Sequence, residues 1–101
     1  MRSERKAEQE LKSQGWLVYR VKGSTKFNKN VDIFGLWDIL AIKKISPNLS
    51  RTSETAIVLI QVKTNKKPTL KPFKAFAQKY PDIECMIWIY KDRKEKEVII
   101  L

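Results

Sequence analysis

The amino-acid sequence predicts an α/β fold whose elements follow the order helix, three strands, helix, two strands. Two observations predict it. Five short apolar runs are bounded by turn-forming or charged residues, and two other segments carry apolar residues at helical spacing. The chain has 101 residues, of which 43% are hydrophobic, enough for one domain with its own core. We therefore expect a single α/β domain over residues 1–101.

Residues 3–14 have the pattern of a helix. Ser3 can cap its start, no Gly or Pro interrupts it, and Gly15 can end it. Ala7 and Leu11 are four residues apart and therefore share one face. Residues 16–21 then have the composition of a strand, and a polar loop follows over residues 22–33.

The next two predicted strands are the most apolar segments of the chain. The first covers about residues 36–45 and the second about residues 55–64, and a turn-rich segment at 46–53 connects them. The almost unbroken apolar run within the second strand predicts a central strand that is covered on both faces.

A second helix is predicted at about Leu70–Tyr80, between prolines at 68 and 81. Strands at Glu84–Tyr90 and Val98–Leu101 follow, joined by a charged segment. The last strand can be an interface with a second copy or part of the core, and both interpretations stay open. The helix carries an apolar stripe of Leu70, Phe73, Phe76, Ala77 and Tyr80.

The amino-acid composition narrows the classes of function that the protein can have. The chain has 21 Lys and Arg against 11 Asp and Glu, a net charge of +10, which favours a polyanionic partner such as DNA or RNA. It contains no histidine, which excludes histidine-based acid–base chemistry and Ser-His triads. An enzyme with this composition would depend on carboxylates, lysine and a hard metal ion.

The compartment is inferred from what the sequence lacks. Its one cysteine, Cys85, lies among apolar residues and is expected in the core, so no intrachain disulfide forms. No apolar run approaches the roughly 18 residues of a membrane span, and the charged start does not resemble a signal peptide. We expect a cytoplasmic or otherwise intracellular protein, in the host cell if the source is viral.

Polar side chains interrupt the two most apolar strands. Asp38 lies within the first, and Gln61 and Lys63 lie in the second, where they share one face. Burying a lone charge is costly unless it is paired or binds a metal. A strand-end carboxylate that caps a loop or pairs with a lysine is the alternative for Asp38, and an exposed strand end is the alternative for Lys63.

An Asp on one strand followed by (Asp/Glu)-x-Lys on the next resembles the PD-(D/E)XK nuclease motif. The closest likeness is to archaeal Holliday-junction resolvases and their small relatives, over residues 4 to about 65. It implies a restriction-endonuclease-like core, a mixed β-sheet flanked by helices. The residues that carry it are Glu4, Gly15-Trp16, the segment Arg20-Val21-Lys22-Gly23-Ser24, Asp38 and Gln61-Val62-Lys63.

The resemblance also implies roles for these residues. Asp38 would be the principal ligand of Mg²⁺, for which Mn²⁺ can substitute. Gln61 and the carbonyl of Val62 would add oxygen ligands, and Lys63 would be the catalytic lysine. Glu4, on the first helix, would complete the site as a metal or water ligand.

The sequence departs from the motif at one position and offers other acids for the site. Gln61 stands where most relatives have an acid, which removes one negative charge and weakens binding of a divalent ion. Glu8 and Glu10 compete with Glu4 on the same helix, and a solvated helix face is the alternative for all three. Asp32, before the strand, is the second-choice acid.

DNA contacts are expected on both sides of the motif. The resemblance implies that Arg20 and Ser24 contact the scissile phosphate region, although turn chemistry and a strand-edge cation explain them equally well. Lysines close to Arg20 and Ser24, and others that follow the predicted strand at 55–64, are expected to contact phosphates. A solvated basic face is the alternative. These lysines are Lys22, Lys26, Lys66, Lys67, Lys71 and Lys74.

The function expected from the sequence is a magnesium-dependent DNA endonuclease, resolvase-like and active in recombination or repair. A non-catalytic DNA-binding module on the same fold is the alternative, and a module for RNA or an acidic protein lacks a specific motif. A chain this small would need a homodimer to make paired cuts across a junction.

Overall fold

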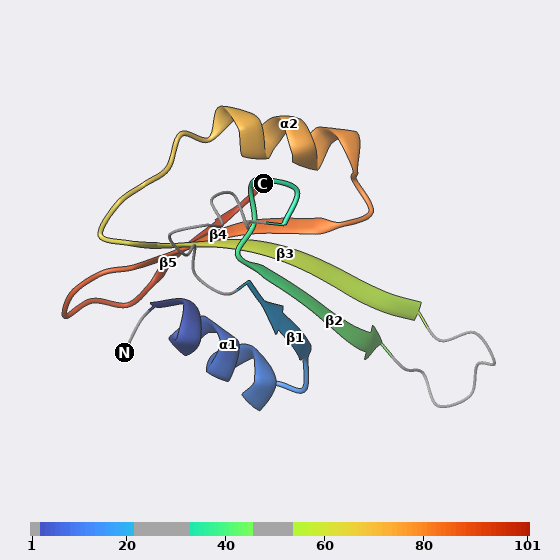
Figure 1. Ribbon diagram of the computed structural model, residues 1–101, viewed down its shortest axis with the longest axis horizontal. Coiled ribbons are helices and arrows are strands. Elements are labelled where there is room, and N and C mark those ends of the chain that lie inside the picture. The colour runs from blue at the N-terminus through green and yellow to red at the C-terminus, as the bar shows by residue number, and fades with distance from the viewer. Residues whose placement is uncertain (1–2, 22–32, 46–53) are drawn as a thin grey trace, which may run out of the picture.

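The computed structural model describes residues 3–21, 33–45 and 54–101 (Figure 1). A five-stranded sheet in the order β1-β2-β3-β4-β5 has a helix on each face. The β3 and β4 strands are parallel, and the other neighbours are antiparallel. This mixed sheet confirms the predicted element order. The elements are α1 (Ser3–Ser13), β1 (Leu17–Arg20), β2 (Ile39–Ile45), β3 (Glu54–Thr64), α2 (Lys71–Lys79), β4 (Glu84–Tyr90) and β5 (Glu97–Ile100).

The α1 helix covers the face formed by β1, β2 and β3. Its Ala7 and Leu11 are buried against Ile60 and Val62 of β3. The helix ends at Gly15, whose φ of +92° lies in the left-handed region, and the N–H of Trp16 donates to the Leu11 carbonyl at 3.1 Å. The predicted helix therefore packs through the face that its spacing indicated.

The α2 helix packs on the opposite face. Phe73 is buried and meets Trp37 edge-on, with ring centroids 5.1 Å apart. Leu59 of β3 and Ile87 of β4 lie in the same cluster. Because the two helices cover different faces, every residue of β3 from Val58 to Val62 is buried, which confirms the prediction of a central strand.

The β2 strand begins later than the sequence suggested. It starts at Ile39 rather than at residue 36, because Phe34 and Gly35 have φ values of 53° and 72° and form a turn closed by an Ile33–Trp37 bridge. The ring of Phe34 stacks on that of Phe76 at 5.7 Å. Asp38 consequently lies at the start of the strand and not within it.

The last strand is divided between the two roles that the sequence left open. Ile99 and Leu101 pack into the core beneath α2, whereas Val98 and Ile100 are exposed at the edge of the sheet. At the other edge, Leu17 and Tyr19 of β1 are also exposed. Cys85 is buried, as expected. None of the helices in the described ranges is long and apolar enough to cross a membrane.

Candidate active site

Asp38 is held beside the central strand by its backbone and its side chain. Its N–H donates to the Ile60 carbonyl at 3.0 Å, and its Oδ2 accepts the N–H of Val62 at 3.0 Å. The register pairs Ile39 with Ile60, so Asp38, the residue before β2, lies next to Gln61. The structure therefore brings together the carboxylate and the Gln-x-Lys segment, which are more than twenty residues apart in the sequence.

Gln61 is buried, with 6% of its surface exposed. Among the described residues, its Oε1 atom has no hydrogen-bond partner. A buried acceptor without a donor costs about 1–3 kcal/mol. An oxygen in this situation gains from a water molecule or a cation, so the observation suits the role of a neutral metal ligand.

Lys63 is two residues beyond Gln61 on β3 and is partly exposed. The ion pairs found within residues 3–21, 33–45 and 54–101 do not include it. The side chain of Val62 between them is buried against α1, which leaves the two polar side chains on the opposite face of the strand. This alternation is the one that the sequence predicted.

The start of α1 is tied to the end of the same strand. The Ser3 and Thr64 hydroxyl oxygens are 2.5 Å apart, so Glu4 lies at the end of β3 that carries Lys63. Ser3, Ala7 and Leu11 form the buried side of the helix. Glu4 is next to Ser3 in the sequence, at the border of this buried side, and is half-buried. Glu4 therefore lies at this end of the sheet on the α1 side, whereas the Gln61 and Lys63 side chains lie on the opposite side.

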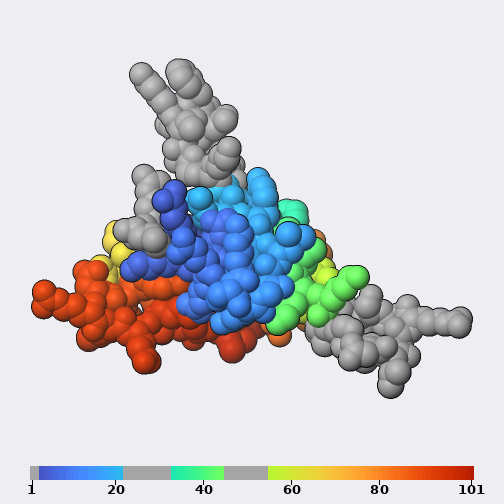
Figure 2. Space-filling model, turned by 90° about the horizontal axis from the view of Figure 1, so that it is seen from below, coloured from blue at the N-terminus to red at the C-terminus, as the bar shows by residue number. Residues whose placement is uncertain are grey.

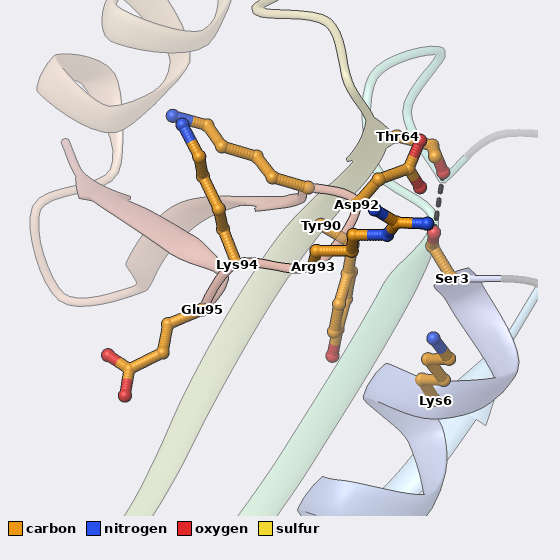
Figure 3. A pocket seen from close by; sticks show the side chains of 9 residues that line it. Ser3, Lys6, Thr64, Tyr90, Asp92, Arg93, Lys94 and Glu95 are labelled. Atoms are coloured by element: carbon orange, nitrogen blue, oxygen red, sulfur yellow. Dashed lines mark hydrogen bonds between the residues drawn. The ribbon is translucent and has the colours of Figure 1, made fainter.

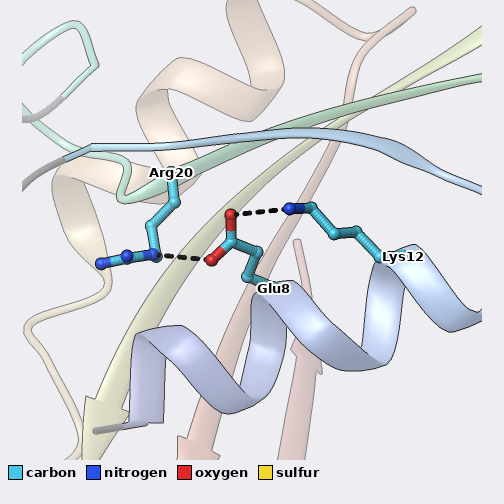
Figure 4. A network of polar contacts seen from close by, with 3 residues as sticks. All are labelled: Glu8, Lys12 and Arg20. Carbon is cyan, nitrogen blue, oxygen red and sulfur yellow. Dashed lines mark hydrogen bonds and ion pairs between the residues drawn. The ribbon is translucent and has the colours of Figure 1, made fainter.

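The competing acids of α1 are engaged elsewhere. Glu8 accepts a hydrogen bond from Arg20 Nε at 2.9 Å and pairs with Lys12 at 3.3 Å (Figure 4). The hydrogen bond from Arg20 lowers the pKa of Glu8 despite its partial burial. Glu10 pairs with Lys96. Of the three helical acids, Glu4 has no ion pair within the described part of the chain, which favours it over its neighbours.

The candidate metal ligands carry few negative charges, but all of them are oxygen atoms. Within the described ranges, no group of three or more His, Cys, Asp and Glu side chains could hold a metal ion. The candidate ligands are the Asp38 carboxylate, the Gln61 amide oxygen, the Val62 carbonyl and Glu4. All are hard oxygens, and Mg²⁺ keeps several waters and needs only one or two protein carboxylates. These residues are therefore the candidates to hold a magnesium ion.

The predicted DNA contacts have different surroundings. Arg20 is bonded to Glu8 and so positions β1 against α1. The four lysines after β3 are exposed, two before α2 and two on it: Lys66, Lys67, Lys71 and Lys74. Lys22, Ser24, Lys26 and Asp32 lie outside the described residues.

One neighbouring feature was not expected from the sequence. Beyond the Ser3–Thr64 contact lies a cavity of about 550 Å³, bounded by α1, Tyr90 and the β4–β5 connection (Figure 3). Its walls come from segments far apart in the chain. The one sequence signal was the run of charged residues at 91–97, which shows charge but not a partner.

Comparison with known proteins gives a structural relative. No protein family and no curated protein sequence matches this chain. The solved structure of Hjc, a Holliday junction resolvase of the archaeal hyperthermophile Archaeoglobus fulgidus, superimposes with a TM-score of 0.56 at 19% identity. The match covers 97% of this chain and 74% of the resolvase. The chain therefore shares the α/β fold of an archaeal Holliday junction resolvase, as the motif had led us to expect.

Proposed function

We propose that this protein is a metal-dependent DNA endonuclease, structure-specific and similar to Holliday-junction resolvases. One observation carries the proposal: the Asp38 carboxylate accepts a hydrogen bond from the Val62 N–H and lies next to the buried Gln61. Lys63 follows two residues after Gln61 on the same face of β3. Asp38 and Lys63 match the first acid and the lysine of the nuclease motif, Gln61 stands at the position of its second acid, and the fold is shared with a resolvase. A role in recombination or repair follows from the same argument.

Asp38, Gln61, the Val62 carbonyl and Glu4 would hold Mg²⁺ or Mn²⁺. The ion would supply positive charge to the scissile phosphodiester and acidify a bound water. The protein positions the groups around it. The Val62 N–H fixes the Asp38 carboxylate through its Oδ2 atom. The ammonium of Lys63 would orient the attacking water and offset the charge that develops on the phosphate.

The amide at position 61 predicts a weak metal site. Replacing a carboxylate by an amide removes one negative charge from the ligands, and Glu4 is the acid available to compensate. The same feature supports a second candidate function, a DNA-binding module that has lost its metal. That module would bind DNA with the usual salt dependence and would not cut it.

DNA is the proposed partner. The net charge of +10 and the exposed lysines around α2 suit phosphate contacts that position a duplex without reading its sequence. We propose one domain over residues 1–101, acting inside the cell as a homodimer. The exposed apolar residues at the sheet edges, among them Leu17 and Ile100, offer surfaces for such contact. Light scattering would distinguish the dimer from the 11.9 kDa monomer.

Cleavage of a labelled DNA panel tests the proposal. The panel contains four-way, nicked, flapped, single-stranded and plain duplex DNA, each incubated with Mg²⁺, Mn²⁺ or chelator, and Asp38→Ala is assayed beside the wild type. Metal-dependent products that disappear in the variant support the nuclease, and the preferred DNA identifies its substrate. Tight binding without products under either metal supports the non-catalytic module instead.

A further inference from the structure

The cavity near the candidate site is formed by four parts of the fold. Ser3 and Lys6 come from α1, Thr64 from the end of β3 and Tyr90 from β4, and residues 91–95 complete the wall (Figure 3). Thr64 follows Lys63 in β3, but its side chain lies on the α1 side of the sheet, opposite the side of Gln61 and Lys63, so the cavity is on the α1 side. Figure 2 shows the same face of the molecule, on which the red β4–β5 hairpin lies beside the blue α1 helix.

The β4–β5 connection is held in place by hydrogen bonds to the end of β3. The Asn65 amide donates to Asp92 Oδ2 at 3.1 Å, and the Asp92 N–H donates back to Asn65 Oδ1 at 3.1 Å. The Asn65 N–H also donates to the Tyr90 carbonyl at 2.8 Å. These three bonds fix the wall of the cavity relative to the strand that carries Gln61 and Lys63.

The charge of the cavity is predominantly positive. Its lining contains four basic side chains, Lys6, Lys91, Arg93 and Lys94, and two acidic ones. Asp92 is bonded to Asn65, and the Glu95 carboxylate points away from the Ser3–Thr64 contact in Figure 3. Burial, followed by the charge of Glu10, raises the pKa of Tyr90 to about 12, so its phenol adds no negative charge at neutral pH.

Three of the four cations are in none of the ion pairs found in the described part of the chain, namely Lys6, Arg93 and Lys94, whereas Lys91 is paired with Glu97. The Lys94 side chain extends away from the Ser3–Thr64 contact in Figure 3, which leaves Lys6 and Arg93. The Lys6 ammonium lies 6.0 Å from the centroid of the Tyr90 ring, and the Arg93 guanidinium extends toward the Ser3–Thr64 contact (Figure 3). The two cations therefore face one cavity from opposite elements.

We propose that this cavity binds an internal phosphodiester of the DNA backbone through Lys6 and Arg93. The proposal rests on the function proposed above and adds a backbone contact on the α1 side of the sheet. A guanidinium binds phosphate oxygens in pairs, and an ammonium acts as a point charge. Such contacts fix the position of the backbone and are indifferent to base sequence.

The test compares two double variants that lose the same charge. Lys6→Gln/Arg93→Gln removes the two cations that are proposed to bind the phosphate. Lys43→Gln/Lys44→Gln removes two exposed lysines of β2, at the end of the sheet far from Thr64. Binding of labelled four-way and duplex DNA is measured by anisotropy in chelator over a series of salt concentrations. We expect the cavity variant to lose about 50-fold in affinity near 0.1 M salt, with a salt slope lower by about 2, and the control to lose less than about 3-fold.

A charge-preserving variant and a DNA end control complete the experiment. Lys6→Arg/Arg93→Lys should retain binding within about 5-fold, which shows that the loss reflects charge and not misfolding. The loss should be the same on DNA with and without terminal phosphates. Equal losses in the cavity and control variants would overturn the proposal, as would a loss confined to DNA that carries a terminal phosphate.

The outcome is independent of cleavage. If the wild type cuts DNA and the cavity variant binds as the control does, the cavity proposal fails and the proposed nuclease stands. If the wild type does not cut and the cavity variant alone loses binding, the cavity proposal stands on a non-catalytic module. A wild type that does not bind DNA would overturn both.

Discussion

Substitution of Gln61 by glutamate tests the candidate metal site through two opposite effects. The residue is 6% exposed and its Oε1 has no partner within the described residues, so the new carboxylate would be buried beside Asp38. Without a metal, an uncompensated buried charge costs about 3 kcal/mol, which lowers the Tm of a domain of this size by about 14 °C. With a metal, the added charge strengthens the site, and a gain of about 1.4 kcal/mol lowers the required Mg²⁺ concentration about tenfold.

Two assays on the same preparation separate these effects. Thermal unfolding in chelator and in Mg²⁺ measures the stability change, and a Mg²⁺ titration of DNA cleavage measures the gain in affinity. Gln78→Glu makes the same chemical change at an exposed position of α2 and should shift stability by less than about 0.5 kcal/mol in either buffer. If Gln61→Glu is as unstable with Mg²⁺ as without it, and its titration is unchanged, Gln61 does not bind the metal.

Three further predictions concern the catalytic lysine, an ion pair and the core. Lys63→Ala should lower the single-turnover cleavage rate about a thousandfold while DNA affinity changes less than about tenfold; a rate near that of the wild type would exclude Lys63 from the chemistry. The pKa of Glu8 is lowered by its hydrogen bond from Arg20, so the pair stabilises the fold at pH above the ordinary value of 4.5 and this contribution is lost as pH falls through the lowered pKa. Glu8→Gln should therefore cost about 1 kcal/mol at neutral pH and less in acid, as measured by urea unfolding, and a pH-independent cost would contradict the pairing. Leu11→Ala should destabilise by about 3 kcal/mol because Leu11 is 3% exposed, whereas Leu17→Ala, at 70% exposed, should cost less than about 1 kcal/mol; similar losses would show that α1 does not pack as described.

The order of the elements could be predicted because local chemistry determines it. Gly15 ends the first helix, Pro68 precedes the second, and apolar runs mark the strands. The start of β2 could not be predicted in the same way. Phe34 adopts a positive φ, which a bulky residue rarely does. Its ring stacks on Phe76 of α2, a contact between distant segments that the local sequence does not reveal.

The candidate site was predictable to the extent that it lies in two adjacent strands. Antiparallel pairing of β2 with β3 places Asp38 beside Gln61, and the period of a strand places Gln61 and Lys63 on one face. The partner of Glu8 was not predictable, because Arg20 lies on a different element and the pairing depends on how α1 docks. The cavity between Lys6 and Arg93 depends on contacts between segments far apart in the chain, and its local signal, the charged run at 91–97, does not reveal them.

The central claim is that Asp38 holds a catalytic metal ion. The most direct test is the single-turnover cleavage rate of a four-way junction across a Mg²⁺ titration, for the wild type and Asp38→Asn. An asparagine can still accept the Val62 N–H, so the fold and the binding of DNA should persist while the charge is lost. We expect the wild type to cut only with a divalent ion and the variant to be slower by at least about a thousandfold. Cleavage by the wild type in chelator, or an equal rate in the variant, would contradict the claim.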